Sequence, residues 1–165
     1  MRPRDVTTLL EAAIKAKLNV LLVGPPGIGK THLQAQAARN AKALNFVMHP
    51  SIGDPTDAKG MPWIFQSNGD APRAEFVPFG ELQAVYDAVA QSLPCALFLD
   101  DLGQATPATQ ASYMSLMDKL RGKCAIIAAT NRRTDKAGVS GLLEPVKSRF
   151  HVIVNVDVSL EDWVS

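Results

Sequence analysis

The chain has 165 residues and a formal net charge of +1, with 47% hydrophobic and 20% charged residues. This size and composition indicate one globular domain with a sizeable core, and the small net charge excludes a strong basic field for nonspecific nucleic-acid binding. No apolar run approaches the roughly 18 residues of a membrane span, and no secretory signal follows the basic start Met1–Asp5. We therefore expect a cytoplasmic protein without membrane contact, in which Cys95 and Cys124 are buried thiols rather than a disulfide or a metal site.

Apolar β-type runs alternate with helix-type stretches along the whole chain. In chain order, we predict a helix over 8–15, a strand over 19–23, a helix over 32–43, a strand over 45–48, a long loop over 49–79, a helix over 81–92, a strand over 95–100, a helix over 107–121, a strand over 125–130, a short helix over 144–148 and a last strand over 151–156. Thr106 and Pro107 give the clearest helix start, a capping hydroxyl followed by proline. The alternation predicts an α/β fold, with a parallel five-stranded sheet flanked by helices.

The long loop over 49–79 differs in composition from the rest of the chain. Pro, Gly and Asp recur in it at short intervals around two brief apolar patches, 63–65 and 76–77, which predict a small hairpin. Loops of this length inside one domain are usually functional. Met61, Trp63 and Phe65 are candidates for a pore or partner contact, and packing of these side chains on the domain's own surface is the alternative.

The octapeptide over 24–31 fits the phosphate-loop pattern G-x-x-x-x-G-K-[ST] at every fixed position, between an apolar strand and a helix. Glycines let successive N–H groups face phosphate oxygens, and the helix that follows adds its positive end. Lys30 is expected to reach the β- and γ-phosphates, and the Thr31 hydroxyl to ligate Mg²⁺. We therefore expect a nucleoside triphosphate and Mg²⁺ as cofactors, with nucleotide contacts from Gly24, Pro25, Pro26, Gly27, Ile28, Gly29, Lys30, Thr31 and His32.

The apolar strand that starts at Cys95 ends in two acids, Asp100 and Asp101, and an amide follows the strand over 125–130. A carboxylate delivered beside the phosphate loop provides a second anchor for Mg²⁺, which we assign to Asp100. Asp101 is then placed to orient or deprotonate an attacking water. Asn131 is expected at the carboxyl end of a central strand, where it can hold that water or a γ-phosphate oxygen. His49 and His151 have no acid or cysteine at ligand spacing, and we interpret them as structural.

The motifs GPPGIGKT, LFLDD, AATN and LLEPVKSRF, in this order, resemble those of the AAA+ ATPases. Within that family, the chain looks most like the MoxR-like and dynein-related branch, which carries an Asp-rich loop and a P-x-x-Q helix start. The matching segments here are 54–62 and 107–110. The resemblance implies that Lys30 and Thr31 belong to Walker A, that Asp100 and Asp101 form Walker B, and that Asn131 is sensor 1.

Arg149, in the motif Ser-Arg-Phe, matches the arginine finger that such proteins insert into a neighbouring subunit's site. A guanidinium at the γ-phosphate stabilises transition-state charge, and is worth about 10³–10⁵ in rate in related chemistry. Arg132 and Arg133 are rival fingers or nucleic-acid contacts, and a plain surface salt bridge is the alternative for Arg149. The resemblance implies a homo-oligomeric ring that acts on an unidentified protein partner, while nucleic acid is possible but unsupported.

Two departures from the family pattern bear on activity. Asp101 stands where most relatives have Glu, so its carboxylate is one methylene shorter. Residues 1–158 form the nucleotide-binding core, and 159–165 resemble the capped start of a helical lid, cut short by truncation or natural loss. The leading prediction is an ATPase module of a remodelling machine. The alternatives are a nucleotide-gated binding module with little hydrolysis and, least favoured, a small-molecule P-loop kinase.

Overall fold

The centre of the computed structural model, which describes residues 1–135 and 141–157, is a sheet of five parallel strands in the order β2-β5-β6-β1-β7. These strands are β1 (Val20–Val23), β2 (Leu44–Met48), β5 (Cys95–Leu99), β6 (Ala125–Thr130) and β7 (Val152–Asn155). The helices are α1 (Pro3–Ala16), α2 (Lys30–Asn40), α3 (Pro55–Lys59), α4 (Gly80–Ala90), α5 (Pro107–Leu120) and α6 (Glu144–Lys147). Two 3-10 turns, Leu102–Gln104 and Arg133–Asp135, also lie among the described residues. The predicted α/β class and parallel five-stranded sheet are confirmed.

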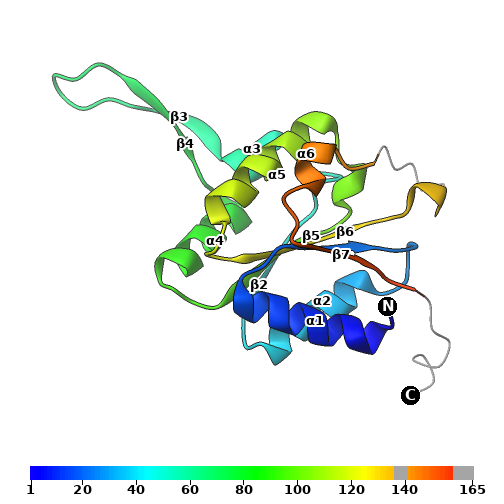
Figure 1. Ribbon diagram of the computed structural model, residues 1–165. Coiled ribbons are helices and arrows are strands. Elements are labelled where there is room, and N and C mark those ends of the chain that lie inside the picture. The colour runs from blue at the N-terminus through cyan, green and yellow to red at the C-terminus, as the bar shows by residue number, and fades with distance from the viewer. Residues whose placement is uncertain (136–140, 158–165) are drawn as a thin grey trace.

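Both faces of the sheet are covered by helices, so its central strands are apolar throughout. Along β5, Leu97 and Leu99 belong to the core cluster under α3, α4, α5 and α6, whereas Ala96 and Phe98 belong to the cluster under α1 and α2. Figure 1 shows these two helical layers on opposite sides of the sheet. The alternation follows from strand geometry, since successive side chains point to opposite faces. Every residue of β5 and β6 is buried.

The largest differences from the predicted helix boundaries are in α1 and α2. Helix α1 begins five residues earlier, at Pro3, where a proline at the first position has the fixed φ that a helix needs. Helix α2 begins directly after the phosphate loop at Lys30 and ends at Asn40, because Lys42 adopts a left-handed conformation with φ 54°. Thr106 caps α5 as predicted, accepting a hydrogen bond of 3.3 Å from the N–H of Thr109.

The segment between β2 and α4 contains more regular structure than the predicted loop. Asp54 caps α3 by accepting from the N–H of Thr56, and Asp57 bonds back to the Asp54 N–H, which forms a capping box. The hydrogen bonds from Thr56 lower the pKa of Asp54. These two carboxylates therefore serve the local helix start.

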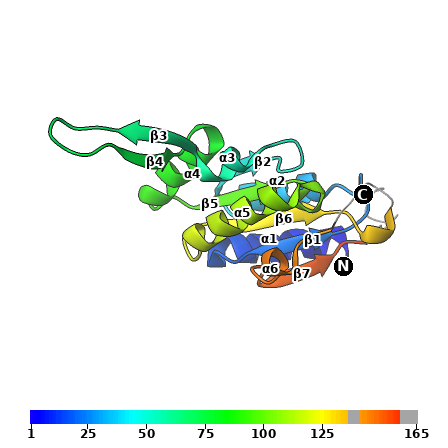
Figure 2. The same cartoon turned by 90° about the horizontal axis from the view of Figure 1, so that it is seen from above.

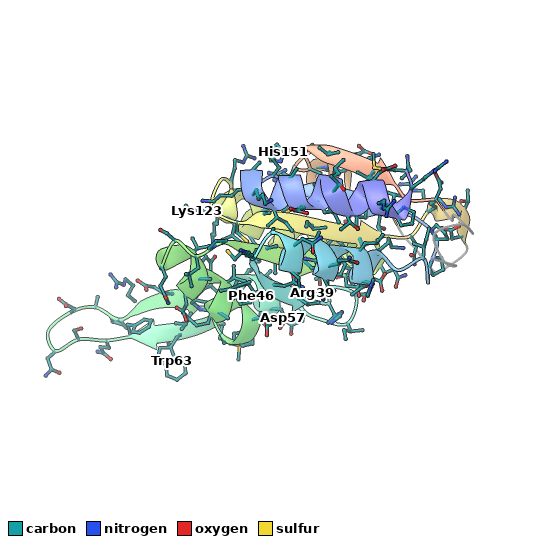
Figure 3. The ribbon with its side chains drawn as sticks, turned by 90° about the horizontal axis from the view of Figure 1, so that it is seen from below. Arg39, Phe46, Asp57, Trp63, Lys123 and His151 are labelled. Carbon is teal, nitrogen blue, oxygen red and sulfur yellow. The ribbon has the colours of Figure 1, made fainter. Side chains whose placement is uncertain are left out.

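The predicted hairpin exists as an antiparallel pair, β3 (Met61–Phe65) and β4 (Arg73–Val77), which projects from the body of the molecule (Figures 1 and 2). Every residue of both strands is exposed. Trp63 is 63% exposed, and Figure 3 shows it on the projecting hairpin. The alternative that these side chains pack on the domain's own surface is therefore wrong for the hairpin strands. An isolated two-stranded ribbon has little stability of its own.

The interpretation of the two cysteines is confirmed, since both are buried free thiols. Cys124 lies just before β6 and Cys95 begins the neighbouring β5, with the Cys124 thiol 3.5 Å from the Cys95 carbonyl oxygen. His151 is structural as predicted, because its Nδ1 accepts a hydrogen bond of 2.9 Å from the Asn19 N–H. In the part of the chain that the structure describes, no helix is long and apolar enough to cross a membrane. The capped helix start expected over 159–165 lies outside the described residues.

We predict that the hairpin can be shortened without loss of stability. Pro62 and Phe76 are paired across the two strands, so an Asn-Gly turn can replace residues 63–75. Since the removed side chains are exposed, the melting temperature should change by no more than about 2 °C in thermal unfolding followed by circular dichroism. The control is Phe98→Ala, which empties a fully buried position and should lower the melting temperature by about 10 °C or more. A large drop for the shortened hairpin would contradict its independence from the core.

Candidate nucleotide-binding site

The loop between β1 and α2 is built around two glycines with left-handed backbone. Gly27 has φ +77° and Gly29 has φ +88°, values that side chains other than glycine adopt at a cost. No heavy atom lies within 4 Å of where a Cβ would be at either position, so both are required by backbone conformation rather than by space. Lys30 follows as the first residue of α2, whose first N–H groups have no partners within the helix. The loop therefore presents N–H donors together with a helix N-terminus.

The Lys30 side chain crosses the mouth of this loop and is only 7% exposed. Its ammonium donates to the carbonyl oxygens of Gly24 at 2.8 Å and Pro25 at 2.9 Å, and to the Asn131 Oδ1 at 3.1 Å. Burial lowers the pKa of Lys30, while the negative charges of Asp101 and Asp100 oppose that shift. The ammonium is thus fixed between the ends of β1 and β6.

The two acids that follow β5 lie side by side at the same edge of the sheet. Burial raises the pKa of Asp100, and the neighbouring Asp101 carboxylate raises it further. Asp101 has φ 54° and ψ 39°, a left-handed conformation in which aspartate is tolerated better than most residues. A half-buried carboxylate beside another one is poorly solvated, so this position favours a bound cation.

These residues line one cavity of about 450 Å³. Its walls are formed by Pro26, Gly27, Gly29, Lys30, Thr31, Asp100, Asp101, Gln104 and Asn131. They come from the carboxyl ends of β1, β5 and β6, which are neighbours in the sheet, and ligands of open α/β sheets bind at that edge. Apart from Gln104, every residue of this set was predicted from the sequence.

Four of the predicted nucleotide contacts lie outside the cavity wall. The Gly24 and Pro25 carbonyls hold Lys30, and a Cβ on Gly24 would come within 2.9 Å of the Val156 carbonyl oxygen. Ile28 is buried in the core cluster beneath α1 and α2. His32 is exposed and lines a groove between α1 and α2. These residues shape or flank the loop, and the structure does not direct them at the cavity.

Arg149 lies near the amino ends of the parallel strands, whereas the cavity lies at their carboxyl ends. It precedes β7, whose residues pair in parallel register with β1, and its carbonyl oxygen accepts a 3.2 Å hydrogen bond from Asn19, just before β1. Its guanidinium pairs with Asp118 of α5. The rival Arg132 is engaged by Asp135, which its guanidinium and N–H both contact. The structure therefore separates Arg149 from the other predicted site residues.

His49 approaches the site residue Asp100 from outside the cavity wall, a contact that the sequence analysis missed. It follows β2, and its Nδ1 lies 3.7 Å from the Asp100 Oδ2. Since β2 pairs with β5 and Met48 is opposite Leu99, the two residues after these strands are brought together. We interpreted His49 as structural because no acid stands at ligand spacing, and that spacing did not reveal this approach because it does not report distance between paired strands. The one available signal was that Asp100 ends one predicted strand and His49 directly follows another.

A five-stranded parallel sheet with a phosphate-type loop after β1 and two acids after β5 defines a P-loop nucleoside triphosphatase fold. The model of the family described as "ATPase family associated with various cellular activities (AAA)" matches residues 20–158. The chain belongs to this family, whose members bind nucleotide and generally assemble into oligomers.

Individual relatives agree with this assignment. The chain is 32% identical over 126 residues to the mouse nuclear valosin-containing protein-like, a match that covers 68% of this chain and 13% of the mouse protein. It is 27% identical over 159 residues to a cell division cycle protein 48 homologue from Archaeoglobus fulgidus, covering 87% of this chain and 19% of that protein. The chain thus spans less than a fifth of either relative.

Among solved structures, the Thermotoga maritima RuvB Holliday junction branch migration motor matches with a TM-score of 0.55 and 22% identity. The match covers 93% of this chain and 43% of that one. At this identity the similarity concerns the fold alone.

We predict that Asp100→Asn stabilises the nucleotide-free protein. Because the folded-state pKa of Asp100 is raised, ionisation of this carboxyl opposes folding at neutral pH, and a neutral amide removes that cost. The melting temperature of the variant should rise by roughly 2 °C, yet Mg²⁺-ATP should stabilise it far less than it stabilises the unmodified protein.

The matched control is Asp135→Asn. Its ion pair with Arg132 lowers the pKa of Asp135, so neutralising this carboxylate should bring no gain in melting temperature. Equal changes in melting temperature for the two substitutions would contradict the interpretation that the ionised Asp100 carboxylate destabilises the folded protein when no cation is bound.

Proposed function

We propose that this chain is the ATP-binding and ATP-hydrolysing module of a ring-forming machine that remodels a protein or protein–nucleic-acid partner. One observation carries the proposal. Lys30, Asp101 and Asn131 share one cavity at the carboxyl edge of the sheet, while Arg149 is fixed at the other edge. An active site divided in this way is complete only when two subunits meet.

Within the cavity, each residue has a role that its chemistry supports. The Lys30 ammonium neutralises β- and γ-phosphate oxygens, exchanging its present carbonyl and amide partners for stronger charged ones. The Thr31 hydroxyl and the Asp100 carboxylate supply the oxygen ligands that Mg²⁺ prefers, so the donor set fits this ion. When bound, Mg²⁺ would stabilise the developing charge on the phosphate oxygens.

The remaining polar groups are assigned to the attacking water. Asp101 orients and deprotonates it, and Asn131 positions it or a γ-phosphate oxygen through its amide. Asn131 already contacts Lys30 at 3.1 Å, so it senses whether the ammonium is engaged by the loop or by phosphate.

Arg149 is assigned the role of an arginine finger acting in trans. Its carbonyl is held next to the start of β1, while the phosphate loop begins where β1 ends. A strand of four residues spans about 13 Å, which an arginine side chain that also pairs with Asp118 does not cross. Arg149 is therefore out of reach of its own nucleotide but sits on the surface, where a neighbouring subunit can meet it.

The oligomeric and partner assignments draw on the relatives as well. The RuvB structure is described as a Holliday junction branch migration motor, and members of the AAA family generally assemble into oligomers. We infer a homo-oligomeric ring, with the exposed hairpin β3–β4 as the element that contacts the remodelled partner. Placement in the MoxR-like branch is supported by the Asp54 capping box and by Gln110, whose buried amide bonds residues 141 and 143.

A second candidate function is a nucleotide-gated binding module that hydrolyses ATP only slowly. The observation that favours it is Asp101, since the shorter carboxylate on a left-handed backbone lies closer to the chain than a glutamate would. In that case ATP binding alone would switch partner affinity.

We predict that ATP hydrolysis per subunit rises with protein concentration and that Arg149→Ala removes this rise. Mixing Arg149→Ala with Asp101→Asn should restore hydrolysis, because one variant keeps the cavity and the other keeps the finger. The measurement is Mg²⁺-dependent phosphate release from a fixed total of protein at varied mixing ratios. Thr8→Ala, an exposed change on α1, is the control and should behave like the unmodified chain.

Two results would count against the motor. Turnover that is independent of concentration and insensitive to Arg149→Ala would show a site complete within one subunit. Absent rescue in the mixture, with both variants assembled, would show that Arg149 does not act in trans.

The two candidate functions are separated by Asp101→Glu. If the motor assignment is right, Asp101 already supports turnover, and the glutamate variant should stay within about threefold of the unmodified chain. A rise of tenfold or more from a near-zero rate, measured as steady-state phosphate release, would instead favour the nucleotide-gated module.

A further inference from the structure

Arg149 is restrained at both its backbone and its guanidinium. Its carbonyl oxygen accepts from the Asn19 amide at 3.2 Å, and Asn19 is only 3% exposed. In the guanidinium, Nε and Nη2 each donate to one Asp118 carboxylate oxygen at 3.0 Å, and Nη1 donates to the Pro145 carbonyl at 2.7 Å. A long, flexible side chain is thus held in one orientation.

The buried Asn19 ties this residue to the centre of the sheet. Besides bonding the Arg149 carbonyl, its Oδ1 accepts from the Ile126 N–H of β6 at 3.2 Å, and its own N–H donates to His151. The backbone at Arg149 is therefore joined to β6 and to the start of β1. Movement of this backbone would break buried hydrogen bonds.

Helix α5 supports the same segment from the other side. Near its start, the buried Gln110 donates to the Gly141 carbonyl and accepts from the Leu143 N–H. Near its end, Asp118 receives the Arg149 guanidinium. The chain from 141 to 149, as described, is therefore braced at both ends by one rigid helix.

The bidentate geometry leaves part of the guanidinium available. Arginine carries five N–H donors, and three are used here, so one remains on each Nη atom. The side chain is 24% exposed, which leaves those donors near solvent. A donor group fixed before its target arrives loses less entropy on binding, and that is the condition for effective electrostatic catalysis.

Stability alone does not account for the pair. Asp118 is 45% exposed, and ion pairs at such exposed sites contribute little to folding. The Arg149 guanidinium nevertheless lowers the pKa of Asp118, so the pair is intact at neutral pH. Arg121 also approaches Asp118, at 3.4 Å, but it forms a single longer contact.

We propose that Asp118 is a positioning residue that holds the Arg149 guanidinium in the orientation in which it acts on the nucleotide of the neighbouring subunit. This inference rests on the proposed function. If it holds, Asp118 of a subunit that cannot hydrolyse ATP affects hydrolysis in the neighbouring subunit to which it donates Arg149.

The test places the Asp118 change only in the finger-donating subunit. The acceptor is Arg149→Ala, and the donor is either Asp101→Asn or the double variant Asp101→Asn with Asp118→Ala. We expect the single-variant donor to restore phosphate release by the acceptor and the double-variant donor to restore at least tenfold less. Asp118→Glu in the donor should recover part of the loss, because it keeps a carboxylate for the guanidinium.

Arg121→Ala in the donor is the matched control, since it removes the other partner of Asp118 and should leave rescue unchanged. Sedimentation velocity and thermal unfolding of each donor should show unchanged assembly and a melting temperature within a few degrees. A double-variant donor that restores as much hydrolysis as the single variant, or more, overturns the proposal. So does loss of assembly, which would make Asp118 an interface residue.

The failures are distinguishable. If the Asp101→Asn donor itself restores nothing while the mixed subunits assemble, the trans-acting finger is wrong, and the role of Asp118 falls with it. If that donor restores hydrolysis and the Asp118 change has no effect, the proposed function stands and only the positioning role is lost.

Discussion

The buried Lys30 ammonium is the constraint on which the rest of the site depends. A buried charged group needs hydrogen-bond partners, and here two loop carbonyls and the Asn131 amide oxygen accept from the ammonium. These partners tie the phosphate loop to the end of β6. Asp100 and Asp101 add negative charge nearby without contacting the ammonium in any hydrogen bond found among the described residues. The site is therefore assembled around a cation before any phosphate arrives.

The carboxyl ends and the amino ends of the parallel strands carry chemically different residues. At the carboxyl ends of the strands, Asp100 and Asn131 share one cavity with Lys30, the first residue of α2. At the amino ends, Asn19 and α5 fix Arg149. The length of the strands sets the distance between Arg149 and the residues of the cavity. Under the proposed function, this separation makes subunit contact a requirement for catalysis, because no side-chain rearrangement spans the length of the strands.

Local sequence predicted the parts of the fold that depend on local chemistry. The glycines of the phosphate loop, the Thr106 cap and the apolar strands follow from backbone and capping rules, and they appear as expected. The His49–Asp100 approach and the Asp118–Arg149 pair depend on which strands and helices are neighbours, and no spacing along the chain encodes that order. The exposure of Trp63 likewise depends on the hairpin projecting from the body, because an apolar patch in a sequence reads the same whether it is buried or not.

The aspartate at position 101 has a backbone explanation that the sequence alone did not offer. The chain leaves β5 and turns at once into the 3-10 segment Leu102–Gln104, and this turn requires a left-handed conformation at Asp101. Aspartate adopts that conformation more readily than glutamate, because its short polar side chain interacts favourably with the nearby backbone. A longer side chain would bring the carboxylate further into the cavity, but a shorter one stabilises the turn. The residue present at this position, aspartate, is the one that favours the turn.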